Sequence, residues 1–319
     1  MWDFSIAKAI ALVVRTWPFT LLRLAIWTAI TIAFVGTTGV GAGLGWGIGH
    51  IGDADFRHGA TFWGGLAGAG VTAVWVFSLR EYLLYLTTAG HVAALVAASE
   101  GRSLPGGVDQ IRMALDAVKS RFGEIHLLFV LDQSIKGAVR AVTGLIEGVG
   151  AFLGLPGLEG MARLAGAVLR VSTTFLDELV LARNLRLATS DPWTTSRESI
   201  VLYAQNAGVV MRNAVWLTVF RAVAAVAIFV AVMGPAAALV WFAPGSGPGW
   251  TFLAALLLTV GLQKSLIDPL CIAALMEVWA RRVEGQRPDP VWDERLASAS
   301  QAFRDIVERA RTAFAGRPA

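Results

Sequence analysis

The sequence predicts an all-α fold, a polytopic membrane helix bundle of about six transmembrane helices with amphipathic elbow helices at the cytoplasmic surface. Of its 319 residues, 55% are hydrophobic and only 16% are charged, well below the roughly 25% charged residues of a soluble domain. Long apolar stretches alternate with connections that are either rich or poor in Lys and Arg. Lipid, rather than water, is therefore expected to cover much of the surface.

Each apolar stretch reaches the roughly 20 residues that a helix needs to cross the hydrocarbon core. The stretches cover 18–49, 61–98, 123–153, 158–186, 213–242 and 250–280. Tryptophans lie near their ends, where the amphipathic indole favours the headgroup layer; they are Trp17, Trp46, Trp63, Trp216, Trp241, Trp250 and Trp279. The first stretch is expected to be an uncleaved span, because no clear small-residue cleavage site follows it.

The distribution of positive charge orients these spans, because short cytoplasmic loops retain Lys and Arg. The connection between the first two spans contains Arg57 as its one cation, and the segments 148–160 and 243–250 contain none. We therefore expect a bacterial inner-membrane protein with both termini in the cytoplasm. Residues 1–290 are expected to form the transmembrane domain and 291–319 a C-terminal amphipathic cytoplasmic helix. Arg23 and Arg221, in the first turns of their spans, are expected to reach back to the headgroups.

Amphipathic stretches precede each pair of spans, and a fourth closes the chain. The first contains Ile6, Ile10, Val13 and Trp17, the second begins near Val108, and the third near Ile200. In the last, the apolar stripe is Trp292, Leu296, Ala299, Phe303, Ile306 and Ala310. Asp191-Pro192 and Asp289-Pro290 each supply an N-cap followed by a proline at the first helical position. The spacing predicts a degenerate three-fold repeat, with chance similarity among elbow helices as the alternative.

The opening phrase Phe4-Ser5-Ile6, at the start of an amphipathic helix that leads into the first span, resembles the YciC-like proteins and the glycerophosphoryl diester phosphodiesterase membrane domain. The resemblance covers the whole chain as architecture, an amphipathic elbow followed by spans. It implies a membrane-embedded helical domain. Some members carry an attached enzyme domain, but the segments here are too short for one, and no catalytic residue is carried over.

Charged residues inside the expected spans are the candidate functional site. Asp132, Lys136 and Arg140 share one helical face at i, i+4 and i+8, and Arg163, Arg170 and Asp177 recur at seven-residue intervals. A charge at mid-bilayer costs roughly 3 kcal/mol, so these groups should pair or line water. The functional interpretation is a polar path; the alternatives are salt bridges between spans or a segment that does not cross fully.

The last span contains Lys264 and Asp268, which are four residues apart and are expected to pair. Pro269 follows and predicts either a simple kink or a broken helix of the kind found at transport sites. The predicted polar path among the third, fourth and sixth spans thus comprises Asp132, Lys136, Arg140, Arg170, Asp177, Lys264 and Asp268.

Glycines recur at intervals of four near the end of the first span. Gly41, Gly45 and Gly49 form one row, and 39, 43 and 47 form a second. Such rows let a neighbouring helix approach closely, so we expect helix packing within or between subunits. A flexible hinge and an oligomer-lined pore are the alternatives.

Motifs for other chemistry are weak or missing in the sequence. His50, Asp53, Asp55 and His58 have metal-like spacing, but a surface loop of ordinary polar residues is the preferred interpretation, and no metal is predicted. The sequence contains no Walker loop, HExxH, GxSxG or dinucleotide fingerprint, so neither an enzyme nor a cofactor is expected. The single cysteine, Cys271, cannot form an internal disulfide. The basic pI of about 9.6 is attributed to lipid headgroups rather than to nucleic acid.

These observations predict a transporter or channel-like protein that uses the polar path. The alternative is a non-transporting membrane scaffold that organises lipid or binds a partner. Expected partners are membrane lipids, further copies of the chain in a homo-oligomer, and a cytoplasmic protein that binds the C-terminal helix.

Overall fold

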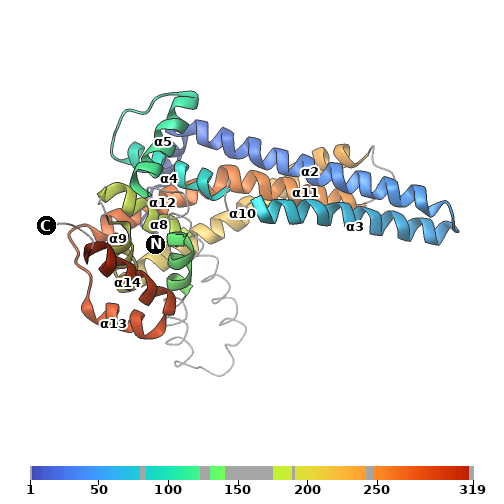
Figure 1. The fold of residues 1–319 in the computed structure, drawn as a ribbon. Helices are drawn as coiled ribbons and strands as arrows, with labels where there is room; N and C mark the ends of the chain where they lie inside the picture. The colour runs from blue at the N-terminus through green and yellow to red at the C-terminus, as the bar shows by residue number, and fades with distance from the viewer. Residues whose placement is uncertain are drawn as a thin grey trace, which may run out of the picture. The chain divides into compact units, whose positions relative to one another are not determined.

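The computed structural model describes residues 2–79, 84–122, 130–140, 175–188, 191–241 and 248–315. Within these ranges every regular element is helical, which confirms the all-α prediction for the described residues (Figure 1). The helices are α1 (Ile6–Arg15), α2 (Trp17–Gly49), α3 (Ala54–Leu79), α4 (Tyr85–Ser99), α5 (Gly107–Phe122), α8 (Leu176–Leu187), α9 (Pro192–Gln205), α10 (Ala207–Val240), α11 (Pro248–Leu262), the π-helical η3 (Gln263–Ile267), α12 (Asp268–Val283), α13 (Pro290–Ala299) and α14 (Gln301–Ala315). Residues 130–140 are also helical.

Contacts divide the chain into two compact units. Unit 1 consists of Met1–Pro18, Thr88–Phe220 and Leu270–Ala319, and unit 2 of Phe19–Thr87 and Arg221–Pro269. Most of the third and fourth predicted spans lies outside the described residues. The domain boundary predicted at residue 290 falls within the last segment of unit 1, and it stays a prediction.

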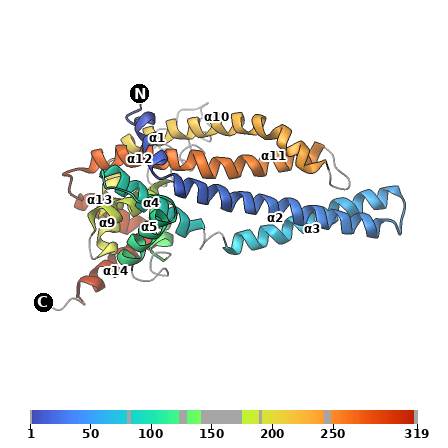
Figure 2. The same ribbon diagram turned by 90° about the horizontal axis from the view of Figure 1, so that it is seen from above.

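Unit 2 contains two helical pairs. α2 and α3 run antiparallel, side by side (Figures 1 and 2), and the hydroxyls of Thr37 and Thr72 meet at 2.6 Å between them. α10 and α11 form the second pair, whose buried contact residues are Val232, Ala236, Val240, Ala254 and Ala255. The two pairs meet where Trp250 lies against Gly65 and where Gly261 lies against Trp27. Small residues at these contacts therefore hold the four helices of unit 2 in one bundle.

The outer surface of unit 2 is apolar along most of its length. Val230 exposes 68% of its surface, and exposed aliphatic side chains recur along all four helices. They include Ile32, Val40, Leu44, Val71, Val74, Val223, Val226, Leu253 and Leu256. A surface of this kind is unfavourable in water and favourable in lipid.

Three helices are long and apolar enough to cross a membrane: Trp17–Gly49, Ala207–Val240 and Gly249–Val283. They coincide with the first, fifth and sixth predicted spans. The chain therefore has helices compatible with a membrane protein.

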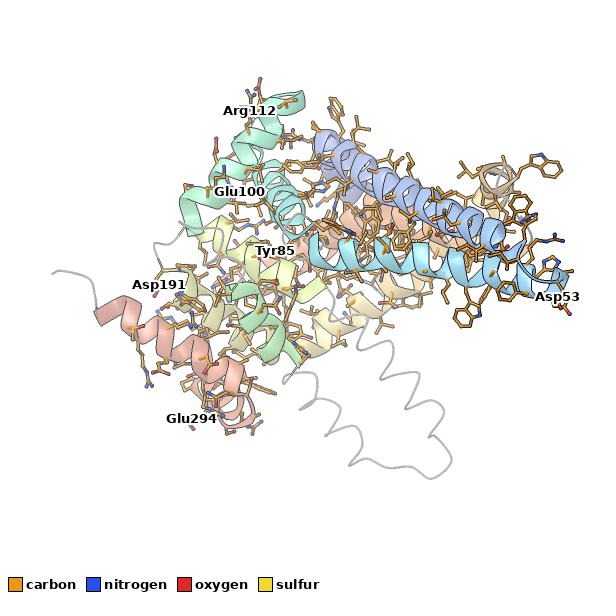
Figure 3. All side chains as sticks on the ribbon, turned by 45° about the vertical axis from the view of Figure 1, so that its right-hand side comes forward. Asp53, Tyr85, Glu100, Arg112, Asp191 and Glu294 are labelled. Atoms are coloured by element: carbon orange, nitrogen blue, oxygen red, sulfur yellow. The ribbon has the colours of Figure 1, made fainter. Side chains whose placement is uncertain are left out.

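Polar groups and tryptophans mark the two ends of unit 2. At a rise of 1.5 Å per residue, Arg23 and Trp46 are about 35 Å apart along α2. Trp250 and Asp268 are about 27 Å apart along the helix that runs from α11 to the start of α12. Both lengths are close to the thickness of about 30 Å of a hydrocarbon core. Asp53 lies in the turn between α2 and α3, at the far end of that pair (Figure 3).

Unit 1 is built around α9, which packs against α8, α13 and α14. Ile200 and Leu202 of α9 are fully buried, as are Leu296 of α13 and Phe303 of α14. Residues 89–98 of α4 are also buried throughout. Residues 89–98, the last part of the predicted second span 61–98, thus lie in the core of unit 1.

The C-terminal segment differs from the single amphipathic helix predicted over 291–319. It contains two helices, α13 and α14, because Ser300 is extended and its hydroxyl caps the second helix by accepting from Phe303 N–H at 3.2 Å. Four residues of its apolar stripe, Leu296, Phe303, Ile306 and Ala310, are buried inside unit 1, whereas Trp292 is half-buried and Ala299 is exposed. The N-caps predicted at Asp191 and Asp289 are confirmed, with the prolines at the first helical positions.

Candidate functional site

The carboxylate of Asp268 is the centre of a charged cluster in unit 2. Its Oδ1 lies 2.9 Å from Arg221 Nε, and its Oδ2 lies 3.0 Å from Lys264 Nζ. Only 6% of the Asp268 side chain is exposed, against 19% of Arg221 and 35% of Lys264, so the carboxylate is the buried member of the cluster. The cluster joins α10 to the junction of η3 and α12.

A π-helical turn places Asp268 beside its partners. Pro269 has no backbone N–H, and its ring would clash with the carbonyl four residues earlier in a regular α-helix. The chain accommodates it by widening over Gln263–Ile267, where Asp268 N–H donates to Gln263 O. The Gln263 side chain donates to Arg221 O at 3.0 Å and ties the wide turn to α10. The helix therefore continues through Pro269 rather than unwinding.

A second charged cluster lies in unit 1 and joins residues 130–140 to α8. Lys136 Nζ is 2.6 Å from Asp132 Oδ2 and 3.7 Å from Asp177 Oδ2. The side chain of Asp132 is 3% exposed and that of Lys136 is 41% exposed, so the cluster has one buried end and one open end. Arg140 is exposed, and its Nε donates to Lys136 O at 3.1 Å.

The helical segment that carries this cluster is packed inside unit 1. Leu131, Ile135 and Ala138 are buried, and a methyl group at Gly137 would lie 2.7 Å from the Cβ of Ala302 in α14. The described part of the predicted third span thus contacts the C-terminal helix.

The structure brings the predicted polar-path residues together in two groups. Asp132, Lys136 and Asp177 meet in unit 1, and Lys264 meets Asp268 in unit 2. Arg170 lies outside the described residues. A path that joins the two groups stays a prediction.

Sequence reasoning missed one partner in this site. Arg221 was expected to reach back to the headgroups, whereas its guanidinium contacts Asp268. A usable signal was present in the sequence, because both residues interrupt long apolar runs with opposite charge and must either pair or reach water.

The glycines predicted to pack helices lie at the contact between α2 and α3. A methyl group at Gly45 would lie 2.7 Å from the Ala60 carbonyl carbon, and one at Gly49 would lie 2.6 Å from the Cα of Arg57. Gly41 meets the backbone of Gly64 in the same way. The residues of the second row, 39, 43 and 47, have open space around them.

The loop with metal-like spacing has structural contacts instead. Asp53 Oδ1 accepts from Phe56 N–H at 2.8 Å and caps the start of α3, and His50 Nδ1 lies 2.9 Å from Trp46 O. Among the described residues, no group of three or more His, Cys, Asp or Glu side chains is arranged to hold a metal ion.

Two further ionic contacts of unit 1 lie outside the two charged clusters. Arg197 of α9 pairs with Asp293 of α13, with Nε 2.8 Å from Oδ1, and this hydrogen bond raises the pKa of Arg197. Near the N-terminus, hydrogen bonds from Asn213 and then Arg212 lower the pKa of Asp3. Both contacts tie distant parts of the chain together.

No family model, curated protein or solved structure matches this chain. The resemblance to YciC-like proteins therefore stays a prediction.

Proposed function

We propose that this protein is a multi-pass integral protein of a bacterial inner membrane and that it serves as a non-transporting scaffold. The observation that supports this most directly is the pairing of its buried carboxylates: Asp268 lies between Arg221 and Lys264, and Asp132 contacts Lys136. Arg221 with Asp268 joins α10 to the start of α12, and Lys136 with Asp177 joins residues 130–140 to α8, so these ion pairs hold helices together. A transport path requires groups that exchange partners during each cycle.

The proposed topology follows from unit 2. α3 runs antiparallel along α2, so α3 crosses wherever α2 crosses, although its composition alone does not identify it as a span. Together with α10 and the continuous run from α11 to α12, this gives four crossings and both termini on one side. The two further spans predicted over 123–186 would preserve this parity. The scarcity of Lys and Arg in the α2–α3 turn favours a cytoplasmic location for the termini.

The proposed scaffold surface is the polar outer face of α13 and α14. Leu296, Phe303, Ile306 and Ala310 of their apolar stripe are buried in unit 1, so a cytoplasmic partner would meet the exposed, mixed-charge face instead. That face includes Glu294, Arg295, Ser298, Arg304, Glu308 and Arg311. Homo-oligomerisation is not required by this arrangement.

Transport is the second candidate function, and one observation favours it. A π-helical turn, a proline and a buried aspartate coincide at Gln263–Pro269 inside a candidate membrane span. π-Turns occur frequently at functional sites, and interrupted helices bind substrates in many transporters.

Flux and stability measurements on the same variants separate the two functions. The full-length protein is reconstituted into liposomes, and proton, potassium and chloride fluxes are measured for wild type, Asp132→Asn and Asp268→Asn. The scaffold proposal predicts flux equal to that of empty vesicles and lower thermal stability in both variants. Flux in the wild type that is lost in stable, folded variants would instead assign transport.

A further inference from the structure

The N-terminal helix α1 presents an apolar stripe on its outer surface. Ile6, Ile10 and Val14 expose 44%, 45% and 62% of their surfaces and follow one another at four-residue intervals. Trp2 and Trp17 continue the stripe at its two ends, and both are about half exposed. The corresponding stripes of α9 and α14 are buried in unit 1. The sequence predicted similar elbow helices at these places, and the structure distinguishes α1 from α9 and α14.

Polar contacts hold α1 in this orientation. Lys8 Nζ lies 3.1 Å from Glu277 Oε1, and Arg15 donates to the carbonyl oxygens of Ala98 and Arg102 at 2.9 and 3.0 Å. The hydroxyl of Thr16, which follows the helix, lies 3.0 Å from Nε2 of the buried His91. The helix is therefore fixed to unit 1 by its other faces, and the stripe is held outward.

The stripe is continuous with candidate membrane-spanning helices at both ends. α1 ends at Arg15, and α2 begins at Trp17 (Figure 2). At the other end, the ring of Trp2 meets Trp216 of α10 edge-on, with centroids 5.4 Å apart. Trp216 and Phe220 are themselves exposed at the start of the apolar surface of α10. Whatever solvent covers that part of α10 also reaches the stripe.

Exposed cations surround α1. Lys8 and Arg15 lie on the helix itself, and Arg212 and Arg281 contact Asp3 just before it. An apolar stripe with tryptophans and bordering Lys and Arg side chains is the composition of a helix that lies in a membrane interface. Basic groups at this level attract anionic headgroups by about 1 kcal/mol each.

We propose that α1 is an interfacial helix whose stripe lies in the headgroup layer of an anionic phospholipid leaflet. The inference rests on the proposed membrane placement of α2 and α10. The occupant of the stripe is the lipid leaflet, rather than a second copy of the chain or a soluble protein.

Site-directed spin labelling of the full-length protein tests the proposal. Cys271 is fully buried and is replaced by alanine, and single cysteines are introduced as Ile10→Cys on the stripe, Ser298→Cys on the exposed face of α13, and Val226→Cys on the exposed surface of α10. If Cys271→Ala does not fold, the single cysteines are introduced into the wild-type sequence. Wild-type protein treated with the same spin label then gives the signal that comes from Cys271. Each variant is reconstituted into vesicles of phosphatidylcholine alone and of phosphatidylcholine with an equal amount of phosphatidylglycerol.

Collision with oxygen, which partitions into lipid, is compared with collision with a water-soluble nickel chelate. We expect oxygen to dominate at Ile10→Cys and nickel at Ser298→Cys, and we expect the oxygen-to-nickel ratio at Ile10→Cys to rise when phosphatidylglycerol is present. Dominance of nickel at Ile10→Cys would place the stripe in water, and little collision with either reagent would mean that protein covers it. Either result overturns the proposal, and an equal ratio in the two vesicle types overturns its anionic part.

The label at Val226→Cys separates this inference from the proposed function. Dominance of oxygen at Val226→Cys with dominance of nickel at Ile10→Cys rejects the interfacial role of α1 alone. Dominance of nickel at both positions rejects the membrane placement of unit 2 as well.

Discussion

Substitution of the α2 glycines by alanine tests the packing of unit 2, because neighbouring glycines of one helix have different surroundings. Gly45 faces the backbone of α3, where a methyl group would lie 2.7 Å from the Ala60 carbonyl carbon, whereas Gly43 has nothing within 4 Å. Alanine is favoured over glycine in a helix by about 1 kcal/mol, and this gain applies at both positions. At Gly45 it is opposed by overpacking, which costs about 1–3 kcal/mol when the backbone must move.

We therefore expect Gly45→Ala to destabilise the protein by up to about 2 kcal/mol and Gly43→Ala to be neutral or stabilising by up to about 1 kcal/mol, so that Gly45→Ala is the less stable variant by about 1–3 kcal/mol. The free energy of unfolding is measured for both variants and the wild type by denaturant titration in mild detergent micelles, with helical circular dichroism as the signal. The difference between the two variants is the informative quantity, because the gain in helix propensity cancels. Equal stability of the two variants would refute the contact between α2 and α3 at Gly45.

Three further predictions concern ion pairs and caps. Asp268→Ala leaves Arg221 and Lys264 without their carboxylate and should lower the free energy of unfolding by about 3–5 kcal/mol. A triple variant that also replaces both cations by Met should recover most of this loss. Denaturant titration measures the free energy of unfolding of both variants. Asp191→Ala removes the N-cap of α9 and should lower the stability of the folded protein by about 1 kcal/mol, whereas Asp191→Asn should lower it by less. Thermal melts of the two variants measure this difference. The lowered pKa of Asp3 means that its ionised form stabilises the folded state, so the wild type should melt above Asp3→Asn at neutral pH. That difference should vanish as the pH falls through the lowered pKa, and a pH-independent difference would contradict it.

Local features of this chain could be read from its sequence. Asp132 with Lys136, and Lys264 with Asp268, pair at i, i+4 because one helix fixes both members. The caps at Asp191 and Asp289 follow from the chemistry of Asp-Pro at a helix start.

Features that depend on the surroundings of a helix could not be read in this way. Residues 89–98 of α4 are as apolar as a membrane span, yet they are buried in protein, and hydropathy does not distinguish lipid from a protein core. The amphipathic stripes of α1 and α14 also look alike in sequence, but Phe303 is buried by α9 and its neighbours while Ile10 is exposed. The pair of Arg221 and Asp268 is distant in sequence, so only the fold brings it together.

The placement of unit 2 across the bilayer is tested most directly by the sidedness of two cysteines in intact cells. Asp53→Cys labels the turn between α2 and α3, and Ser298→Cys labels α13, each in the full-length protein with Cys271 replaced. A membrane-impermeant maleimide applied to spheroplasts should modify Asp53→Cys at once and Ser298→Cys only after the membrane is opened. If both cysteines react before the membrane is opened, or if neither reacts until it is opened, the proposed crossing is contradicted.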